Sequence, residues 1–337
     1  MTLQSADAPV LSGPAPVGKS FASLAVSELR READNIVSVF LKAPTGGVLP
    51  PWEPGAHIDV LFGNGILRQY SLCSDPAERS YWRIAVLREL PGRGGSRYIH
   101  ESLKAGDVLD IRGPQNNFRG TPGSGEKVFI AGGIGITPLL PMIRAAYQKG
   151  ESWRLLYLGS SLRSMAFVEE LAVLDPAGDK VCIRAREKSG RTDLTEYLRG
   201  AGLTGDATVF TCGPERMLAE LRAAHTDGLV PHLLFEDFGG GPGGGPADDD
   251  APFLVETADG TQIDVGENET ILEALERAGV PALNSCRKGT CGTCETAVVA
   301  GIPDHRDEIL SHEERAANET IMICVSRCRG ERLVLDL

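Results

Sequence analysis

The sequence predicts three folded domains: an antiparallel β-barrel, a doubly wound α/β domain and a smaller α+β domain. The chain has 337 residues, more than a single hydrophobic core usually organises. The hydrophobic pattern changes after Gly125, and a segment of glycine, proline and aspartate separates the last part of the chain. These changes predict a loose tail at 1–18, the barrel at 19–122, the α/β domain at 123–238, a linker at 239–250 and the last domain at 251–337.

The barrel is predicted from short runs in which apolar and polar residues alternate. Such runs occupy residues 36–41, 58–61 and 82–87, and glycine and proline separate them. Alternation with a period of two is typical of strands with one buried face, and closely spaced turns favour antiparallel pairing.

Strands and helices alternate in the next region, which predicts a parallel, doubly wound sheet. The first helix is expected to take Thr137 as its N-cap and Pro138 as its first residue, and to end at Gly150. Strands are expected at 127–131, 154–158, 181–184 and 208–211, and further helices near 166–174, 194–198 and 215–224.

The last domain begins with a hairpin-like pattern at 253–265. Thr270 and Glu273 then form a capping-box pattern that opens a helix, and Gly279 is expected to end it. This order of strands and helix predicts a small α+β domain.

The formal charge of −12 is concentrated in the last domain, where residues 251–337 hold 16 Asp and Glu against 8 Lys and Arg. An acidic chain is unsuited to binding phosphate backbones, so no nucleic-acid partner is expected. The acidic domain either steers a basic protein partner or is a solvated surface, and the composition alone leaves both open.

No membrane partner is expected either. The longest uncharged stretch, residues 128–143, is interrupted by glycines and prolines, which makes it unsuitable as a membrane span. The first residues lack a basic region followed by an apolar core, so the sequence predicts no signal peptide and a cytoplasmic protein.

Four cysteines of the last domain predict an iron–sulfur cluster. Cys286, Cys291 and Cys294 have the C-x4-C-x2-C spacing of plant-type [2Fe-2S] ferredoxins, in which a tight loop brings thiolates to two irons. Cys324 and Cys328 are both available as the fourth ligand, and Cys324 is preferred because it follows an apolar run at 321–323. Structural zinc and buried thiols are the alternatives, which this spacing disfavours. A cluster of this type carries one electron at a time.

A glycine-rich turn joins the first predicted strand of the α/β domain to its first helix. Backbone N–H groups at such a turn receive a pyrophosphate, which suggests a dinucleotide site, although a plain tight turn has the same composition. Cys212, Gly213 and Pro214 follow the last strand expected in this domain, at the sheet edge where ligands bind. The turn consists of Gly132, Gly133, Ile134, Gly135, Ile136, Thr137 and Pro138.

Two motifs of the barrel suggest a mononucleotide. Arg68, Gln69, Tyr70 and Ser71 combine a guanidinium for phosphate, an aromatic face for stacking and a hydroxyl for a polar ring edge. The loop 92–96 adds a cation and a hydroxyl among glycines, suited to a terminal phosphate. Each motif alone is also compatible with an ordinary strand end or turn.

Taken together, these motifs resemble the phthalate dioxygenase reductase family over nearly the whole chain. The resemblance implies a flavin barrel, a pyridine-nucleotide domain and a plant-type ferredoxin domain of the β-grasp fold. It also implies FMN rather than FAD, NADH as reductant, and a separate terminal oxygenase of the Rieske type as protein partner. The FMN contacts that it implies are Arg68, Gln69, Tyr70, Ser71, Val86, Leu87, Arg88, Arg93, Gly94, Gly95, Ser96, Thr137 and Phe238.

The resemblance leads to a hypothesis for the mechanism. NADH delivers a hydride to flavin N5, and electrons leave singly through the cluster to an oxygenase or demethylase. Ser71 or Thr137 is expected to place a polar group near N5, and Cys212 to lie near the nicotinamide. NADPH stays an alternative because residues 159–163 contain no acid and include Arg163. Reduction of small free acceptors and a redox-sensing role are the rival functions.

Overall fold

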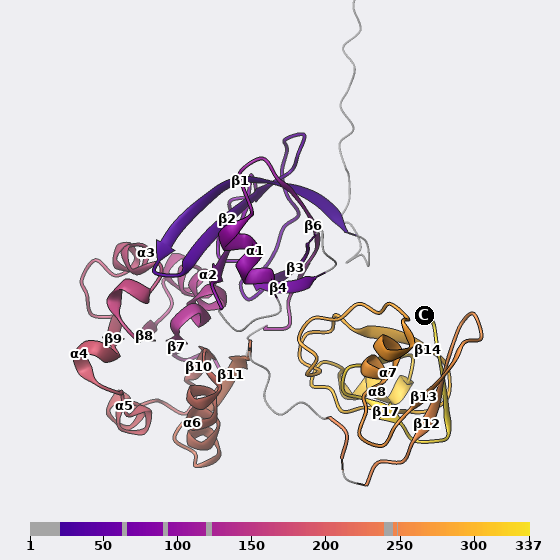
Figure 1. The fold of residues 1–337 in the computed structure, drawn as a ribbon. Coiled ribbons are helices and arrows are strands. Elements are labelled where there is room, and N and C mark those ends of the chain that lie inside the picture. Colours follow the sequence, from indigo (N-terminus) through magenta and orange to yellow (C-terminus); the bar gives the residue numbers. More distant parts are fainter. Residues whose placement is uncertain (1–20, 63–65, 90–93, 119–122, 239–244, 248) are drawn as a thin grey trace, which may run out of the picture.

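The computed structural model describes residues 21–62, 66–89, 94–118, 123–238, 245–247 and 249–337 (Figure 1). The predicted tail 1–18 and most of the predicted linker lie outside these ranges. Three main sheets of the described residues follow one another along the chain, in the predicted order, and a further two-stranded sheet lies in the last domain. No helix of the described residues combines the length and the hydropathy needed to cross a membrane.

The first domain is an antiparallel six-stranded barrel, as predicted. The strand order is β4-β3-β6-β1-β2-β5. A bridge between Leu72 and Ile84 joins the end of β4 to β5 and closes the sheet on itself. The helix α1 was not predicted. The elements are β1 (Ala22–Ala33), β2 (Ile36–Lys42), β3 (His57–Leu61), β4 (Leu67–Ser71), β5 (Trp82–Leu87), α1 (Gly95–Glu101) and β6 (Val108–Gln115).

The second domain is a parallel sheet in the order β11-β10-β7-β8-β9, with apolar side chains packed on both faces. The chain runs outward from β7 in one direction and returns to β10 on the other side. The strands β7 and β10 therefore form the switch point, at whose carboxyl edge doubly wound sheets bind ligands. The elements are β7 (Lys127–Gly132), α2 (Ile136–Gln148), β8 (Trp153–Gly159), α3 (Val168–Leu174), β9 (Val181–Ala185), α4 (Arg186–Ser189), α5 (Leu194–Ala201), β10 (Thr208–Cys212), α6 (Glu215–Thr226) and β11 (His232–Glu236).

The start of α2 differs from the prediction. A single 3₁₀ turn, Gly133–Gly135, leads directly into the helix, which begins at Ile136 with Gly135 as its N-cap. Thr137 therefore lies inside the first turn, where its hydroxyl donates to the Ile134 carbonyl at 2.9 Å. The predicted end is correct, because Gly150 follows the helix with a φ of +65°, which glycine adopts without strain.

The third domain is an α+β unit with its own core. Its main sheet has the order β13-β12-β18-β14-β16, and Thr270 caps α7 reciprocally with Glu273 as predicted. Gly279 ends that helix in the left-handed conformation. The elements are β12 (Phe253–Thr257), β13 (Gln262–Val265), α7 (Ile271–Ala278), β14 (Glu295–Ala300), β15 (Pro303–Asp304), α8 (His312–Ala317), β16 (Thr320–Met322), β17 (Arg327–Cys328) and β18 (Arg332–Leu335).

Candidate functional site

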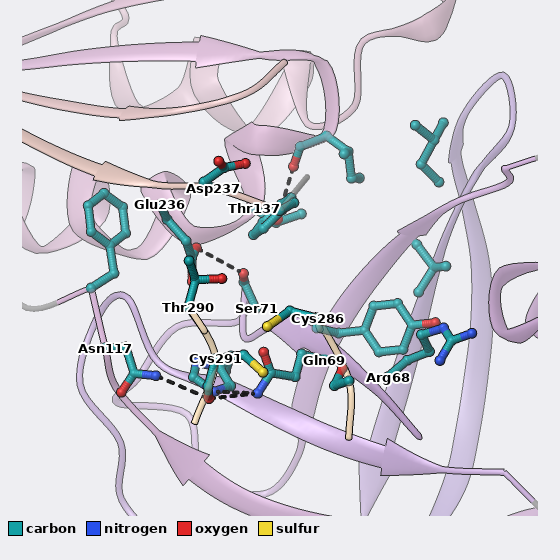
Figure 2. Close-up of a pocket in the computed structure, with 18 of the residues that line it drawn as sticks. Arg68, Gln69, Ser71, Asn117, Thr137, Glu236, Asp237, Cys286, Thr290 and Cys291 are labelled. Carbon is teal, nitrogen blue, oxygen red and sulfur yellow. Dashed lines mark hydrogen bonds between the residues drawn. The ribbon is translucent and has the colours of Figure 1, made fainter. Parts of the chain in front are cut away.

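A cavity of about 550 Å³ lies where the three domains meet (Figure 2). This volume is in the range of sites that enclose a small ligand or cofactor. The barrel, the α/β domain and the third domain all contribute side chains to its wall. Its lining includes Arg68, Gln69, Tyr70, Ser71, Val86, Leu87, Gly95, Ser96, Asn117, Ile134, Thr137, Glu236, Asp237, Phe238, Cys286, Thr290 and Cys291.

The predicted phosphate-binding residues come together at one end of the cavity. Gly95 opens α1 so close to the side chain of Arg68 that a Cβ on this glycine would lie 2.8 Å from Arg68 Cγ. Gly94 precedes it with a φ of +92°, a conformation that favours glycine. The start of α1 and the arginine thus form one cradle that fits a phosphate. Arg93, the other cation predicted here, lies outside the described residues.

The remaining predicted flavin contacts divide into two groups. Val86, Leu87 and Phe238 line the cavity, and Phe238 keeps 47% of its surface exposed. Arg88 does not line it, because its guanidinium pairs with Glu101 of α1. The structure therefore leaves the side chain of Arg88 outside the candidate site.

Glu236 lines the same cavity and was not predicted from the sequence. Its carboxylate accepts a hydrogen bond from the Ser71 hydroxyl at 3.4 Å, which links β11 of the α/β domain to β4 of the barrel. Burial raises the pKa of Glu236 to about 8. The sequence contained an indication of this position, because Glu236 ends a strand, and Asp237 follows it, at the carboxyl edge of a doubly wound sheet.

The glycine-rich turn packs directly against the loop that follows β10. A Cβ on Gly132 would lie 2.5 Å from Pro214, and one on Gly135 would overlap the Cys212 carbonyl. Only glycine allows the two loops to lie this close together at the switch point. Cys212 itself is fully buried beneath this contact and does not line the cavity, and burial raises the pKa of its thiol well above the usual value.

Four thiols of the third domain converge beside the cavity. The sulfur of Cys286 lies within hydrogen-bonding contact of Cys291 and Cys324, and Cys324 is in the same contact with Cys294. Cys328 points elsewhere, because its thiol donates to the Arg332 carbonyl at 3.4 Å. Cys324 therefore lies with the other three thiols, whereas Cys328, the alternative fourth ligand, does not.

This donor set fits a two-iron cluster. Among the residues that the structure describes, no group of three or more His, Cys, Asp or Glu side chains is arranged around a single metal ion. A [2Fe-2S] cluster divides four thiolates between two irons, so its ligands need not meet at one point. Gly289 lets the loop close, because its φ is +73° and a Cβ there would lie 2.6 Å from Val325.

Known proteins resemble this chain over nearly its whole length. A family model described as a 2Fe-2S iron-sulfur cluster binding domain matches residues 255–329. Tetrachlorobenzoquinone reductase of Sphingobium chlorophenolicum is 39% identical, over 93% of this chain and 97% of that protein. The carnitine monooxygenase reductase subunit of Escherichia coli (strain K12) is 38% identical, over 93% of this chain and 97% of that subunit.

Solved structures agree with these relatives. Phthalate dioxygenase reductase, described as a modular structure for electron transfer from pyridine nucleotides to [2Fe-2S], superposes with a TM-score of 0.68 and 35% identity, covering 94% of this chain and 98% of that one. An intact type IV self-sufficient cytochrome P450 monooxygenase superposes with a TM-score of 0.79 and 39% identity. That match covers 94% of this chain, which spans 41% of the monooxygenase.

The fold and the cysteine arrangement, with these relatives, define a modular electron-transfer oxidoreductase with a ferredoxin domain. The chain belongs to the phthalate dioxygenase reductase family. The family and the three-domain fold class predicted from the sequence are thereby confirmed. We refer to the three domains below as the barrel, the nucleotide domain and the ferredoxin domain.

Proposed function

We propose that this protein takes a hydride from NADH onto FMN and passes single electrons through a [2Fe-2S] cluster to a partner Rieske-type oxygenase or demethylase. The observation that carries the proposal is the shared cavity, in which flavin-type motifs, the nucleotide loop, Cys286 and Cys291 lie side by side. FMN supplies the change from two-electron to one-electron chemistry when it is bound, and the cluster carries one electron at a time.

The barrel residues would hold FMN by its two ends. Arg68 and the start of α1 receive the phosphate, because the guanidinium and the loop form one cradle. Tyr70 offers an aromatic face, and burial raises the pKa of its hydroxyl, so this group keeps its proton. Further contacts are proposed for Gln69, Ser71, Val86, Leu87, Arg93, Gly94, Gly95, Ser96, Thr137 and Phe238.

The nucleotide domain would position NADH at the carboxyl edge of β7 and β10. The turn 132–138 presents its backbone to the pyrophosphate. The residues Cys212, Gly213 and Pro214 pack directly against this turn. Glu236 holds a proton at its carboxyl group up to about pH 8, within reach of the Ser71 hydroxyl. We propose this pair as the proton-holding group of the site.

The cluster ligands proposed are Cys286, Cys291, Cys294 and Cys324. The support is the convergence of these four thiols and the different direction of Cys328. The acidic ferredoxin domain is proposed as the part that meets the oxygenase, and the cytoplasm, where NADH is generated, as the place of action.

A visible spectrum combined with flavin extraction tests the proposal. We expect the purified protein to release FMN, and Cys291→Ser to lose the cluster absorbance while keeping the flavin. Cys328→Ser is the matched control and should retain both spectra. Released FAD would contradict the mononucleotide assignment, and loss of the cluster in Cys328→Ser but not in Cys324→Ser would reverse the choice of fourth ligand.

A further inference from the structure

Polar side chains cross three neighbouring strands of the barrel at one level and face the ferredoxin domain. Gln69 of β4 lies opposite Asp59 of β3, and Asp59 lies opposite Arg112 of β6. Arg112 donates to one oxygen of Asp59, with its Nε at 2.8 Å. Asp59 is fully buried and Arg112 is 7% exposed. This row, Gln69–Asp59–Arg112, is therefore a fixed polar feature of the barrel wall and not a set of mobile surface groups.

The row contacts the loop that carries the cluster cysteines. The Gln69 amide donates to the Cys291 carbonyl at 3.2 Å and to the Thr293 hydroxyl at 3.0 Å. The Thr293 hydroxyl in turn donates to the second oxygen of Asp59 at 3.4 Å. Asn117 adds a donor to the Cys291 carbonyl at 3.4 Å (Figure 2). The loop is thus held through its backbone and one hydroxyl.

The charges and donors of the row are arranged for this contact. Arg112 orients Asp59, which leaves its other oxygen for Thr293. The amide nitrogen of Gln69 reaches two acceptors of the loop, a carbonyl and a hydroxyl, and also lies 3.3 Å from His57 Nε2 within the barrel. Thr293 is 3% exposed, so its hydroxyl would be buried without a partner if the row were apolar.

We propose that this row is a docking latch that holds the cluster loop against the barrel, and that Gln69 and Thr293 are positioning residues for electron transfer from flavin to cluster. The effect of the latch on electron transfer rests on the proposed function, whereas the docking of the cluster loop rests on the contacts alone. Both the donors and the acceptors of these hydrogen bonds can bind water instead when the ferredoxin domain leaves the barrel. The latch is therefore reversible, with the docked form favoured.

Thr293→Val tests the latch from the ferredoxin side. The variant keeps the shape of the side chain and removes its two hydrogen bonds to the barrel, to Gln69 and Asp59. It also removes the contact of the hydroxyl with the Cys291 thiol, and Thr293 does not line the flavin cavity. Two lost bonds should lower the ratio of docked to undocked molecules roughly tenfold. Thr296→Val is the matched control, because the Thr296 hydroxyl donates within its own domain, to the Cys294 carbonyl at 3.2 Å.

Two measurements on the holoprotein read out the docked form. Stopped-flow absorbance with NADH separates flavin reduction from cluster reduction, and we expect Thr293→Val to slow only the second step, by up to about tenfold. Small-angle X-ray scattering should show a larger radius of gyration for this variant than for Thr296→Val. If Thr293→Val matches Thr296→Val in both measurements, the latch is wrong.

Gln69→Leu tests the same contact from the barrel side. The two single variants share the loss of the Gln69–Thr293 bond, and each removes one further bond, to the Cys291 carbonyl or to Asp59. The double variant with Thr293→Val should therefore be less extended in scattering than the sum of the two single changes. Independent, additive effects on the radius of gyration would overturn the proposal. If NADH reduces neither centre of the wild type, the proposed function fails, whereas the scattering comparison still decides the latch.

Discussion

The barrel meets its two neighbours through contacts of opposite character. Against the nucleotide domain it shares one hydrophobic core, in which Ile36 and Ala85 of the barrel pack with Ile136, Leu139 and Phe167. Against the ferredoxin domain, Gln69 and Asn117 donate hydrogen bonds and Asp59 accepts one, and the ferredoxin domain keeps a separate core. The two contacts therefore differ in the free energy needed to separate the domains.

Buried polar groups reinforce the first contact. Arg83 of β5 is 5% exposed and donates to Glu170 of α3 at 2.6 Å and to the Cys73 carbonyl at 3.1 Å. Arg144 of α2 binds the same carboxylate and the same carbonyl. Exposing the apolar core and these paired charges together is costly, so the barrel and nucleotide domain should behave as one unit.

The second contact has a lower cost of opening. Its hydrogen bonds can be exchanged for bonds to water with a net change of about 0.5–1.5 kcal/mol each. The two electron-input domains are therefore built as a rigid pair, and the electron-output domain as a separable one. This arrangement suits a protein that must present one cluster first to a flavin and then to a partner.

The largest expected effect breaks the rigid pair. Leu139→Ala removes a fully buried side chain from the shared core and should lower the free energy of unfolding of the barrel–nucleotide unit by about 2–5 kcal/mol. Calorimetry should show one shifted transition for both domains and an unchanged ferredoxin transition. Leu275→Ala removes a side chain from the ferredoxin core and is the matched control, which should shift only the ferredoxin transition. Separate transitions for barrel and nucleotide domain would contradict the shared core.

A smaller effect concerns the proton of Glu236, at the junction of the rigid pair. The folded protein holds this proton up to about pH 8, whereas the unfolded chain releases it near 4.5. The contribution to stability is therefore complete below pH 4.5 and is lost as the pH rises through 8. Glu236→Gln lacks this loss, so its stability relative to the wild type should rise by about 1 kcal/mol between pH 7 and pH 8.

Thermal unfolding of the barrel–nucleotide unit across pH 6–9 measures this difference. Glu169→Gln replaces an exposed glutamate in α3 and should follow the wild type throughout. A Glu236→Gln variant that tracks the wild type across the same range would show that Glu236 is ionised in the folded protein.

Features encoded locally were predictable from the sequence. The spacing of Cys286, Cys291 and Cys294 lies within one loop, and the alternation of strands and helices predicted the doubly wound sheet. Capping at Thr270 and the end of α2 before Gly150 followed from residue types within a few positions. Each of these depends on near neighbours in the chain.

Features that depend on distant residues were not predictable. Gln69 and Thr293 are 224 positions apart, and no local pattern indicates that they meet. Gln69 was expected only to contact FMN, and Arg88 was expected there although it pairs with Glu101. The pKa of Glu236 likewise arises from burial, which only the assembled domains create.

The smallest expected effect concerns the attachment of the separable domain. Asp250 was assigned to the linker, but its carboxylate accepts a hydrogen bond from Arg306 at 2.7 Å and lies 3.2 Å from Arg327 Nε. The Arg306 guanidinium lowers the pKa of Asp250 to about 2. The ferredoxin domain therefore fixes the chain from this residue onward, and the anchor belongs to the separable domain.

Asp250→Asn should lower the free energy of unfolding of the ferredoxin domain by about 0.5–1 kcal/mol, because Arg327 still donates to the carbonyls of Glu269, Ala251 and Gly266. The wild-type advantage is present above pH 3.8 and disappears as the pH falls through about 2. Asp249→Asn, at an exposed neighbour, is the control for calorimetry at neutral pH. If the ferredoxin domain unfolds at the same temperature in both variants, Asp250 belongs to the linker. If the barrel–nucleotide transition shifts in Asp250→Asn, the Asp250 ion pairs also stabilise that unit.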